Sequence, residues 1–230
     1  LVLGAGNVSS IPVLDALFHM IANKSVIYLK LNPVNDYLLP IFTQIFEPFI
    51  ARGFMVVSEG DMKASQYLTE HDGFQHTHLT GSNYTYENIV YGRTLSDKER
   101  SLKTLPKINK KPITTELGNV TPIIVHPGNW STSEIKHQAK KIVTAKLNNS
   151  GFNCIAAQVV VLPKGWKYTE RLKKEINSNP NKNETNGILF PEKIIPVPKI
   201  QIRITVKINC SKNSIKKCVV NNYLQNSFNS

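Results

Sequence analysis

The chain has 230 residues, of which 41% are hydrophobic and 19% charged, as is ordinary for a globular protein of one or two domains. Its sequence contains no apolar run near the roughly 18 residues that a membrane-spanning helix needs. The net charge is +12, but half of the basic excess follows Ile176, which favours a solvated tail over a nucleic-acid interface on a folded scaffold.

The cysteine pattern bears on metal binding and on the redox compartment. Cysteines at positions 154, 210 and 218 show neither metal-ligand spacing with the six histidines nor an even-numbered disulfide framework. We therefore predict no metal site, and a reducing compartment, the cytosol. Residue 1 is a leucine inside a strand-like run, so we expect a fragment in which a missing targeting signal is uninformative.

Strand-like and helix-like segments alternate along the first half of the chain. Short apolar or β-branched segments predict strands at residues 1–6, 25–31, 53–60, 76–82 and 112–118. Between them, apolar residues at three- and four-residue spacing predict helices over 10–23 and 37–52. This alternation is typical of an α/β fold with a Rossmann-like, mostly parallel sheet and helices on both faces.

The pattern restarts after Pro122 and predicts part of a second α/β subdomain. Its predicted elements are a strand over 123–128, a helix over 132–148, a strand over 156–166 and a helix over 167–177. We therefore divide the chain into domains at 1–118 and 119–175, followed by a divergent, basic tail at 176–230. Prolines interrupt this Asn-, Lys- and Ile-rich tail, so we expect it to stand outside the fold and to be proteolysed first.

The first predicted strand ends in an incomplete dinucleotide-binding fingerprint. Gly4 and Gly6 match its start, but Ser9 stands where the third glycine belongs. The second strand ends in Lys30, where a Rossmann unit carries an acidic residue for the ribose. Two glycines alone are therefore weak evidence for a nucleotide site.

Three side chains have the chemistry for covalent catalysis at a carbonyl group. Cys154 follows a glycine-containing turn, Glu116 closes a predicted strand and Asn7 follows another. A thiol, a carboxylate and an amide supply a nucleophile, a general base and an oxyanion donor. A buried structural thiol is the alternative for Cys154 taken alone. We predict that these three residues face one cleft between the two subdomains.

These residues lie in motifs that resemble those of the aldehyde dehydrogenase superfamily, across residues 1–166. The motifs are GAGN at 4–7, HLTGS at 78–82, ELGNVTP at 116–122 and SGFNC at 150–154. The resemblance implies that 1–118 is an N-terminally truncated coenzyme domain and 119–175 a partial catalytic domain. It also implies oxidation of a small aldehyde to a carboxylic acid with NAD or NADP, and it leaves open a homo-oligomer of the full-length protein.

The resemblance implies a role for each site residue. The Cys154 thiolate attacks the aldehyde, the Asn7 amide stabilises the oxyanion, and Glu116 activates water to hydrolyse the thioester. The residues assigned to coenzyme binding are Lys30, Asn32, Gly60, Gly81 and Ser82. Of these, Lys30 bonds to the adenine ribose, whereas Gly81 and Ser82 lie beside the pyrophosphate.

One position bears on the choice of coenzyme. NAD-preferring members of the superfamily commonly carry a glutamate three residues after the ribose lysine, where Pro33 stands here. No carboxylate at that position opposes a 2′-phosphate. We therefore predict that the complete enzyme accepts NADP at least as readily as a glutamate-bearing relative, unless Asp36 folds back.

Several departures from the superfamily pattern keep other interpretations open. Phe152 replaces a glutamine, Asn119 replaces a glycine, and the segment from Gly81 to Glu116 is longer than usual. The later Glu-x-Phe motif has no counterpart, because Glu192 comes too soon after the cysteine motif. The alternatives are an acyl-CoA reductase of the same superfamily and a non-catalytic truncated remnant, while a nucleic-acid-binding module is supported by net charge alone.

Overall fold

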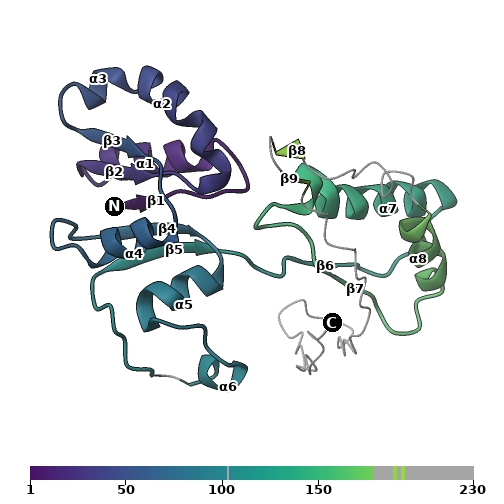
Figure 1. Cartoon of the computed structure of the whole chain (residues 1–230). Coiled ribbons are helices and arrows are strands. Elements are labelled where there is room, and N and C mark those ends of the chain that lie inside the picture. The colour runs from purple at the N-terminus through teal and green to yellow at the C-terminus, as the bar shows by residue number, and fades with distance from the viewer. Residues whose placement is uncertain (103, 179–188, 191–192, 195–230) are drawn as a thin grey trace. The chain divides into compact units, whose positions relative to one another are not determined.

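The structure of the chain is a computed structural model that describes residues 1–102, 104–178, 189–190 and 193–194 (Figure 1). The chain divides into two compact units, Leu1–Gly118 and Asn119–Ser230. Within the described ranges, every helix is too short or too polar to cross a membrane.

The described part of the first unit is built on a five-stranded sheet in which all strands run parallel, in the order β3-β2-β1-β4-β5. The strands are β1 (Val2–Leu3), β2 (Ile27–Lys30), β3 (Met55–Ser58), β4 (Thr77–Gly81) and β5 (Ile113–Leu117). Each strand lies inside a segment predicted to be a strand. The predicted α/β, Rossmann-like fold is therefore confirmed.

Helices cover both faces of this sheet. They are α1 (Ile11–Ile21), the 3-10 helix η1 (Pro33–Leu38), α2 (Leu39–Ile45), α3 (Glu47–Ile50), α4 (Met62–Glu70), α5 (Asn83–Tyr91) and α6 (Asp97–Arg100). On one face Val2 and Leu29 pack against α1 and α2, with Ala16 of α1 fully buried. On the other face Leu3 and Leu79 pack against side chains of α4 and α5. Because successive side chains of a strand point to opposite faces, the sheet contributes apolar side chains to two separate cores.

The helix predicted over 37–52 is broken, which corrects the expectation from the sequence. Helix α2 ends at Ile45 and α3 begins at Glu47, and Phe46 between them has left the helical conformation with ψ at 12°. Pro48 has no backbone N–H to donate to the preceding turn, so a continuous helix would lose a hydrogen bond here.

The described part of the second unit combines a parallel strand pair with two longer helices. Its elements are β6 (Pro122–Ile124), α7 (Thr132–Leu147), the 3-10 helix η2 (Asn148–Gly151), β7 (Val159–Val161), α8 (Thr169–Asn177), β8 (Leu189–Phe190) and β9 (Lys193–Ile194). Ser131 and Glu134 form a reciprocal capping box that starts α7. Ile135 of α7 and Leu172 of α8 are fully buried in one core with Val160 of β7.

The predicted basic tail falls almost entirely outside the described residues. Its first residue, Ile176, belongs to α8 and is 2% exposed in the core of the second unit. The expectation that residues 176–230 are proteolysed first stays a prediction.

A partly buried polar cluster joins α1, β4 and β5. Thr80 Oγ1 donates to Asp15 Oδ2 at 2.7 Å, and His78 Nε2 lies 3.6 Å from the same oxygen. His78 Nδ1 lies 2.9 Å from Thr114 Oγ1 on β5. The ring of His19 on α1 is 4.6 Å from that of His78, centroid to centroid.

Two histidines in and beside this cluster, His19 and His76, have lowered pKa values. Burial lowers the pKa of His19, and the neighbouring His78 and His76 act in the same direction, while Asp15 opposes them. Burial also lowers the pKa of His76, as do the amino group of Leu1 and His78. Both histidines therefore bind protons more weakly in the folded chain than in the unfolded chain.

We expect the first unit to lose stability on acidification below about pH 6.5, the usual pKa of histidine. Because His19 and His76 have lowered pKa values, the unfolded chain binds more protons in this range. The free energy of unfolding is therefore at its full value above the usual histidine pKa of about 6.5 and decreases as the pH falls through the lowered pKa values. Thermal unfolding followed by circular dichroism between about pH 7.5 and 5 measures this dependence.

The control for this prediction is a histidine outside the cluster. His19→Gln removes a titrating ring from the cluster and should flatten the dependence, whereas His137→Gln, on the exposed side of α7, should leave it unchanged. Equal pH slopes for the two variants would contradict the account.

Candidate functional site

The candidate site lies along one edge of the sheet in the first unit. Because its strands run parallel, their carboxyl ends share that edge. After β1 the chain adds β2 and β3 on one side, and it then returns through α4 to place β4 on the other side of β1. Open α/β sheets bind their ligands at such a reversal, outside the carboxyl ends of the strands.

Most of the predicted site residues belong to this edge. They are Asn7, Lys30, Asn32, Gly60, Gly81, Ser82 and Glu116. Lys30 and Gly81 are the last residues of their strands, and Glu116 is the last but one. The remaining predicted residue, Cys154, belongs to the second unit.

The turn that carries Asn7 is tied to the segment that follows β2. Gly4 N donates to Lys30 O at 2.9 Å. The side chain of Asn35, which is 3% exposed, donates from Nδ2 to Ala5 O at 3.0 Å. These two bonds hold the turn against the β2 side of the sheet.

Both glycines of this turn are required by close packing. A Cβ on Gly4 would lie 2.9 Å from Pro12 Cβ, and one on Gly6 would lie 2.7 Å from Asn32 Cγ. The space at Gly6 is therefore filled by the side chain of Asn32, whose Oδ1 accepts a hydrogen bond from Val34 N at 3.1 Å. Asn32 thus begins η1 as its N-cap residue.

Lys30 is a buried cation at the end of β2. It is 4% exposed, and burial lowers its pKa, while the charges of Asp36 and Asp61 act in the opposite direction. Its Cε lies 3.3 Å from the position that a Cβ on Gly60 would occupy. Gly60 has φ at 150°, a conformation that side chains rarely adopt. Glycine at this position therefore leaves room for the lysine side chain.

Two buried oxygens belong to this part of the structure, one on η1 and one at the end of β3. Neither Asp36 Oδ1 nor Ser58 Oγ has a hydrogen-bond partner among the described residues. Ser58 ends β3 beside Lys30 in the sheet register, and Asp36 interacts electrostatically with Lys30 and Glu59. Burial, followed by the charge of Glu59, raises the pKa of Asp36. Since buried polar atoms usually have partners, these oxygens are candidates for contact with a ligand.

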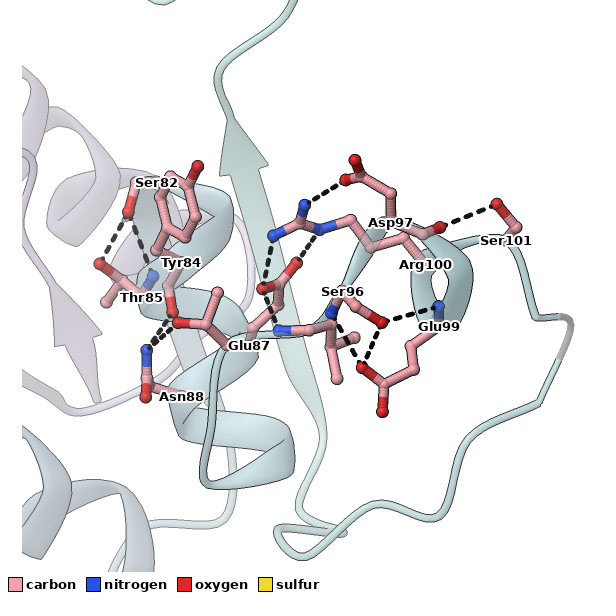
Figure 2. Close-up of polar contacts among 12 residues, drawn as sticks. Ser82, Tyr84, Thr85, Glu87, Asn88, Ser96, Asp97, Glu99, Arg100 and Ser101 are labelled. Carbon is pink, nitrogen blue, oxygen red and sulfur yellow. Dashed lines mark hydrogen bonds and ion pairs between the residues drawn. The ribbon is translucent and has the colours of Figure 1, made fainter. Parts of the chain in front are cut away.

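The end of β4 leads directly into α5. Ser82 is the N-cap residue: its Oγ accepts a hydrogen bond from Thr85 N at 3.1 Å and lies 3.0 Å from Thr85 Oγ1 (Figure 2). Gly81 and Ser82, where a coenzyme contact is predicted, therefore form a strand-to-helix turn. The hydroxyl group of Ser82 caps α5.

Glu87 on α5 anchors the start of the long segment that precedes β5. Its Oε1 accepts a hydrogen bond from Arg100 Nε at 2.7 Å, and its Oε2 accepts from Arg100 Nη2 at 3.0 Å and from Leu95 N at 2.9 Å (Figure 2). Arg100 Nη1 also donates to Asp97 Oδ1 at 2.9 Å. Glu87 is 4% exposed, and its bond to Arg100 lowers its pKa. The segment from Gly81 to Glu116, which is longer than is usual in the superfamily, thus contains a short helix, α6, that is bonded to Glu87 of α5 through Arg100.

Glu116 is exposed near the carboxyl end of β5, at the edge of the sheet. In the register it lies beside Thr80 of β4. Ile113 and Leu117 of the same strand pack into the core that faces α4 and α5. Because successive side chains alternate, Glu116 belongs to the opposite face, where Thr80 contacts Asp15 of α1. An exposed carboxylate on this face has access to water.

Cys154 is a half-buried free thiol in the second unit. It follows η2, in which Asn149 and Ser150 both have φ at 52°. Its carbonyl accepts a hydrogen bond from Asn119 N at 3.3 Å. Positive φ at two successive non-glycine residues is costly and persists only where the surroundings impose it. The convergence of Cys154 with Asn7 and Glu116 stays a prediction.

Sequence reasoning missed the hydrogen bond from Asn35 to the β1 turn and the contact between Asp15 and Thr80. The signal for the first is a polar pair, Asn35 and Asp36, in a proline-started turn just after a predicted strand. In the described part of the chain, histidine, cysteine, aspartate and glutamate side chains do not gather in any group that could hold a metal ion.

Comparison with protein families gives a match over most of the chain. A model described as the aldehyde dehydrogenase family matches residues 30–186. This range contains the predicted site residues from Lys30 to Cys154, and it begins after Asn7. A comparison with curated proteins gives no match.

Solved dehydrogenase structures share the fold. Substrate-bound AldH from Staphylococcus aureus has a TM-score of 0.57 at 19% identity and covers 83% of this chain and 37% of its own. A propionaldehyde dehydrogenase from a Clostridium phytofermentans bacterial microcompartment has a TM-score of 0.56 at 13% identity, and the match covers 84% of this chain and 43% of the dehydrogenase. A 3,6-anhydro-L-galactose dehydrogenase in complex with NAP has a TM-score of 0.55 at 15% identity, and the match covers 91% of this chain and 38% of the dehydrogenase. The chain thus spans less than half of each of these proteins.

We expect Glu87→Gln to destabilise the first unit. The substitution removes the charge that pairs with Arg100 and leaves a buried amide in its place, which costs about 1–3 kcal/mol. Thermal unfolding should show a lower melting temperature, and trypsin should cleave faster at Arg93 and Arg100. The matched control is Glu170→Gln, which removes an exposed pair with Lys173 and should leave both measurements unchanged. Identical results for the two variants would contradict this assignment.

Proposed function

This chain belongs to the aldehyde dehydrogenase family, and we propose that it takes part in the oxidation of a small aldehyde to a carboxylic acid with NAD or NADP. The observation that carries the proposal is the shared carboxyl edge of the parallel sheet, at which the family-matched residues from Lys30 to Glu116 end or follow their strands.

The end of β2 has groups that suit a dinucleotide. Lys30 supplies a buried ammonium group, and Gly60 leaves the space beside it that a Cβ would fill. The oxygens of Asp36 and Ser58 that have no partner among the described residues can accept hydrogen bonds from ribose hydroxyl groups. A solved structure of similar fold is a complex with NAP. In the proposal Lys30 and Asn32 bind the ribose end of the coenzyme, and the turn at Gly81 and Ser82 lies beside its pyrophosphate.

Covalent chemistry in the proposed reaction begins at Cys154. Its thiolate adds to the aldehyde carbonyl, which forms a carbon–sulfur bond and leaves an oxyanion. The Asn7 amide and the backbone N–H of Cys154 donate hydrogen bonds to that oxyanion. Bound NAD or NADP supplies the acceptor for the hydride whose loss converts the adduct into a thioester on Cys154.

Glu116 completes the reaction. Its carboxylate accepts a proton from a water molecule, and the oxygen of that water attacks the thioester. The carbon–sulfur bond breaks, the carboxylic acid leaves and the thiolate of Cys154 is restored. The exposure of Glu116 gives it access to water, which favours hydrolysis over transfer to coenzyme A.

The turn that carries Asn7 supports its proposed role. The hydrogen bonds from Gly4 N to Lys30 O and from Asn35 Nδ2 to Ala5 O hold the backbone shortly before Asn7. An oxyanion donor lowers a barrier only when its position is set before the reaction. The buried side chain of Asn35 is therefore proposed to position Asn7 through the turn.

We expect an acyl group on Cys154 when the full chain reacts with a short aliphatic aldehyde and NAD or NADP. Intact and peptide mass spectrometry should locate the adduct on Cys154 and find none on Cys154→Ala. Glu116→Gln should form the adduct and hydrolyse it about 100-fold or more slowly, because the general base is lost.

Matched variants separate this chemistry from general damage. Cys218→Ala removes another thiol and Glu170→Gln another exposed carboxylate, and both should behave like the unmodified chain. Turnover that survives in Cys154→Ala would overturn the proposed mechanism. Release of the acyl group by coenzyme A but not by water would assign the chain to the acyl-CoA alternative.

A further inference from the structure

We propose that Asp36 makes the coenzyme site selective for NAD over NADP. The proposal rests on the proposed coenzyme binding by the first unit and names its specificity-determining residue. The expected acceptance of NADP rested on Pro33, three residues after Lys30, and left open that Asp36 folds back. In the structure the carboxylate of Asp36 does interact with Lys30.

The 3-10 helix η1 carries Asp36 at the end of β2. Asn32 caps this helix with its side chain, and Asn35 N donates to Asn32 O at 2.7 Å. The buried side chain of Asn35 is bonded to Ala5 O in the turn after β1. Asp36 directly follows Asn35, which is bonded to the turn after β1. The backbone of Asp36 is therefore anchored beside the candidate site.

Asp36 has an acceptor that the described part of the protein does not use. Its Oδ1 is buried without a hydrogen-bond partner among those residues. A buried acceptor gains most from a donor that a bound molecule brings. The ribose 2′-hydroxyl of NAD is such a donor, and in dinucleotide folds an acidic side chain near the end of the second strand commonly accepts this bond. In NADP a phosphate replaces that hydroxyl and brings acceptors only.

The charges around Lys30 also oppose a phosphate. Lys30 interacts with the carboxylates of Asp36 and Asp61, Asp36 interacts with Glu59, and Asp61 interacts with Lys63. Three carboxylates and two ammonium groups thus interact around the end of β2, so negative charges outnumber positive ones there. A 2′-phosphate would add negative charge beside the carboxylates of Asp36 and Glu59, and like charges repel.

The test is isothermal titration calorimetry of the full 230-residue chain with NAD and NADP. Titrations with 5′-AMP and adenosine 2′,5′-bisphosphate report on the ribose end alone. The unmodified chain should bind NAD and 5′-AMP about tenfold or more tightly than their 2′-phosphorylated partners. Asp36→Asn keeps the shape of the side chain and removes its charge. In this variant the affinities for the phosphorylated and unphosphorylated molecule of each pair should differ by no more than about threefold.

Two further variants make the result specific. Asp36→Ser is a second replacement that removes the carboxylate, and it should also reduce the ratios. Asp72→Asn removes a fully exposed carboxylate that lies 3.7 Å from Lys111, and it should leave the ratios unchanged. Melting temperatures confirm that each variant is folded.

The outcomes separate this inference from the proposed function. Binding of NAD and NADP with equal affinity by the unmodified chain, or ratios that Asp36→Asn and Asp36→Ser leave unchanged, would overturn the role of Asp36 alone. Failure of the folded chain to bind any of the four molecules would overturn the proposed coenzyme binding and, with it, this inference.

Discussion

The first unit depends on the pairing of β1, a two-residue strand with parallel neighbours on both sides. Val2 lies beside Leu29 of β2 and His78 of β4, and Leu3 lies beside Lys30 and Leu79. Parallel neighbours require the chain to leave the sheet and cross over before each pairing. Because β2 and β4 take opposite sides of β1, the turn after β1 emerges between their carboxyl ends. Every proposed contact of the first unit follows from that arrangement.

The same edge concentrates buried polar groups, which are costly unless they find partners. Some of that cost is offset within the protein: Asn35 bonds to Ala5, and Thr80 bonds to Asp15. Asp36 Oδ1 is left with no partner among the described residues. A site for a polar ligand accounts for both the internal hydrogen bonds and the unused oxygen. Some of its polar atoms hold the site in place, and others are left to contact the ligand.

Sequence patterns were sufficient for the sheet, because apolar strands between glycine-rich turns have a strong local signal. They also identified the edge residues, since Lys30 and Glu116 lie at or next to the ends of strands that are evident in the sequence. The break at Phe46 was missed because apolar spacing continues across Pro48. The contact of Asn35 was missed for another reason: it depends on a 3-10 turn that brings Asn35 beside Ala5, 30 positions earlier in the chain, and the local sequence does not identify that partner. The sequence left open that Asp36 folds back, and only the structure shows its interaction with Lys30.

The central claim is that the carboxyl edge around β1 binds the coenzyme. Hydrogen–deuterium exchange of the full chain, with and without saturating NAD, tests it most directly. The account predicts slower exchange in segments 4–7, 30–36, 58–61 and 81–85, with little change in α7 and α8. Unchanged exchange in all four segments, or protection confined to the second unit, would contradict it.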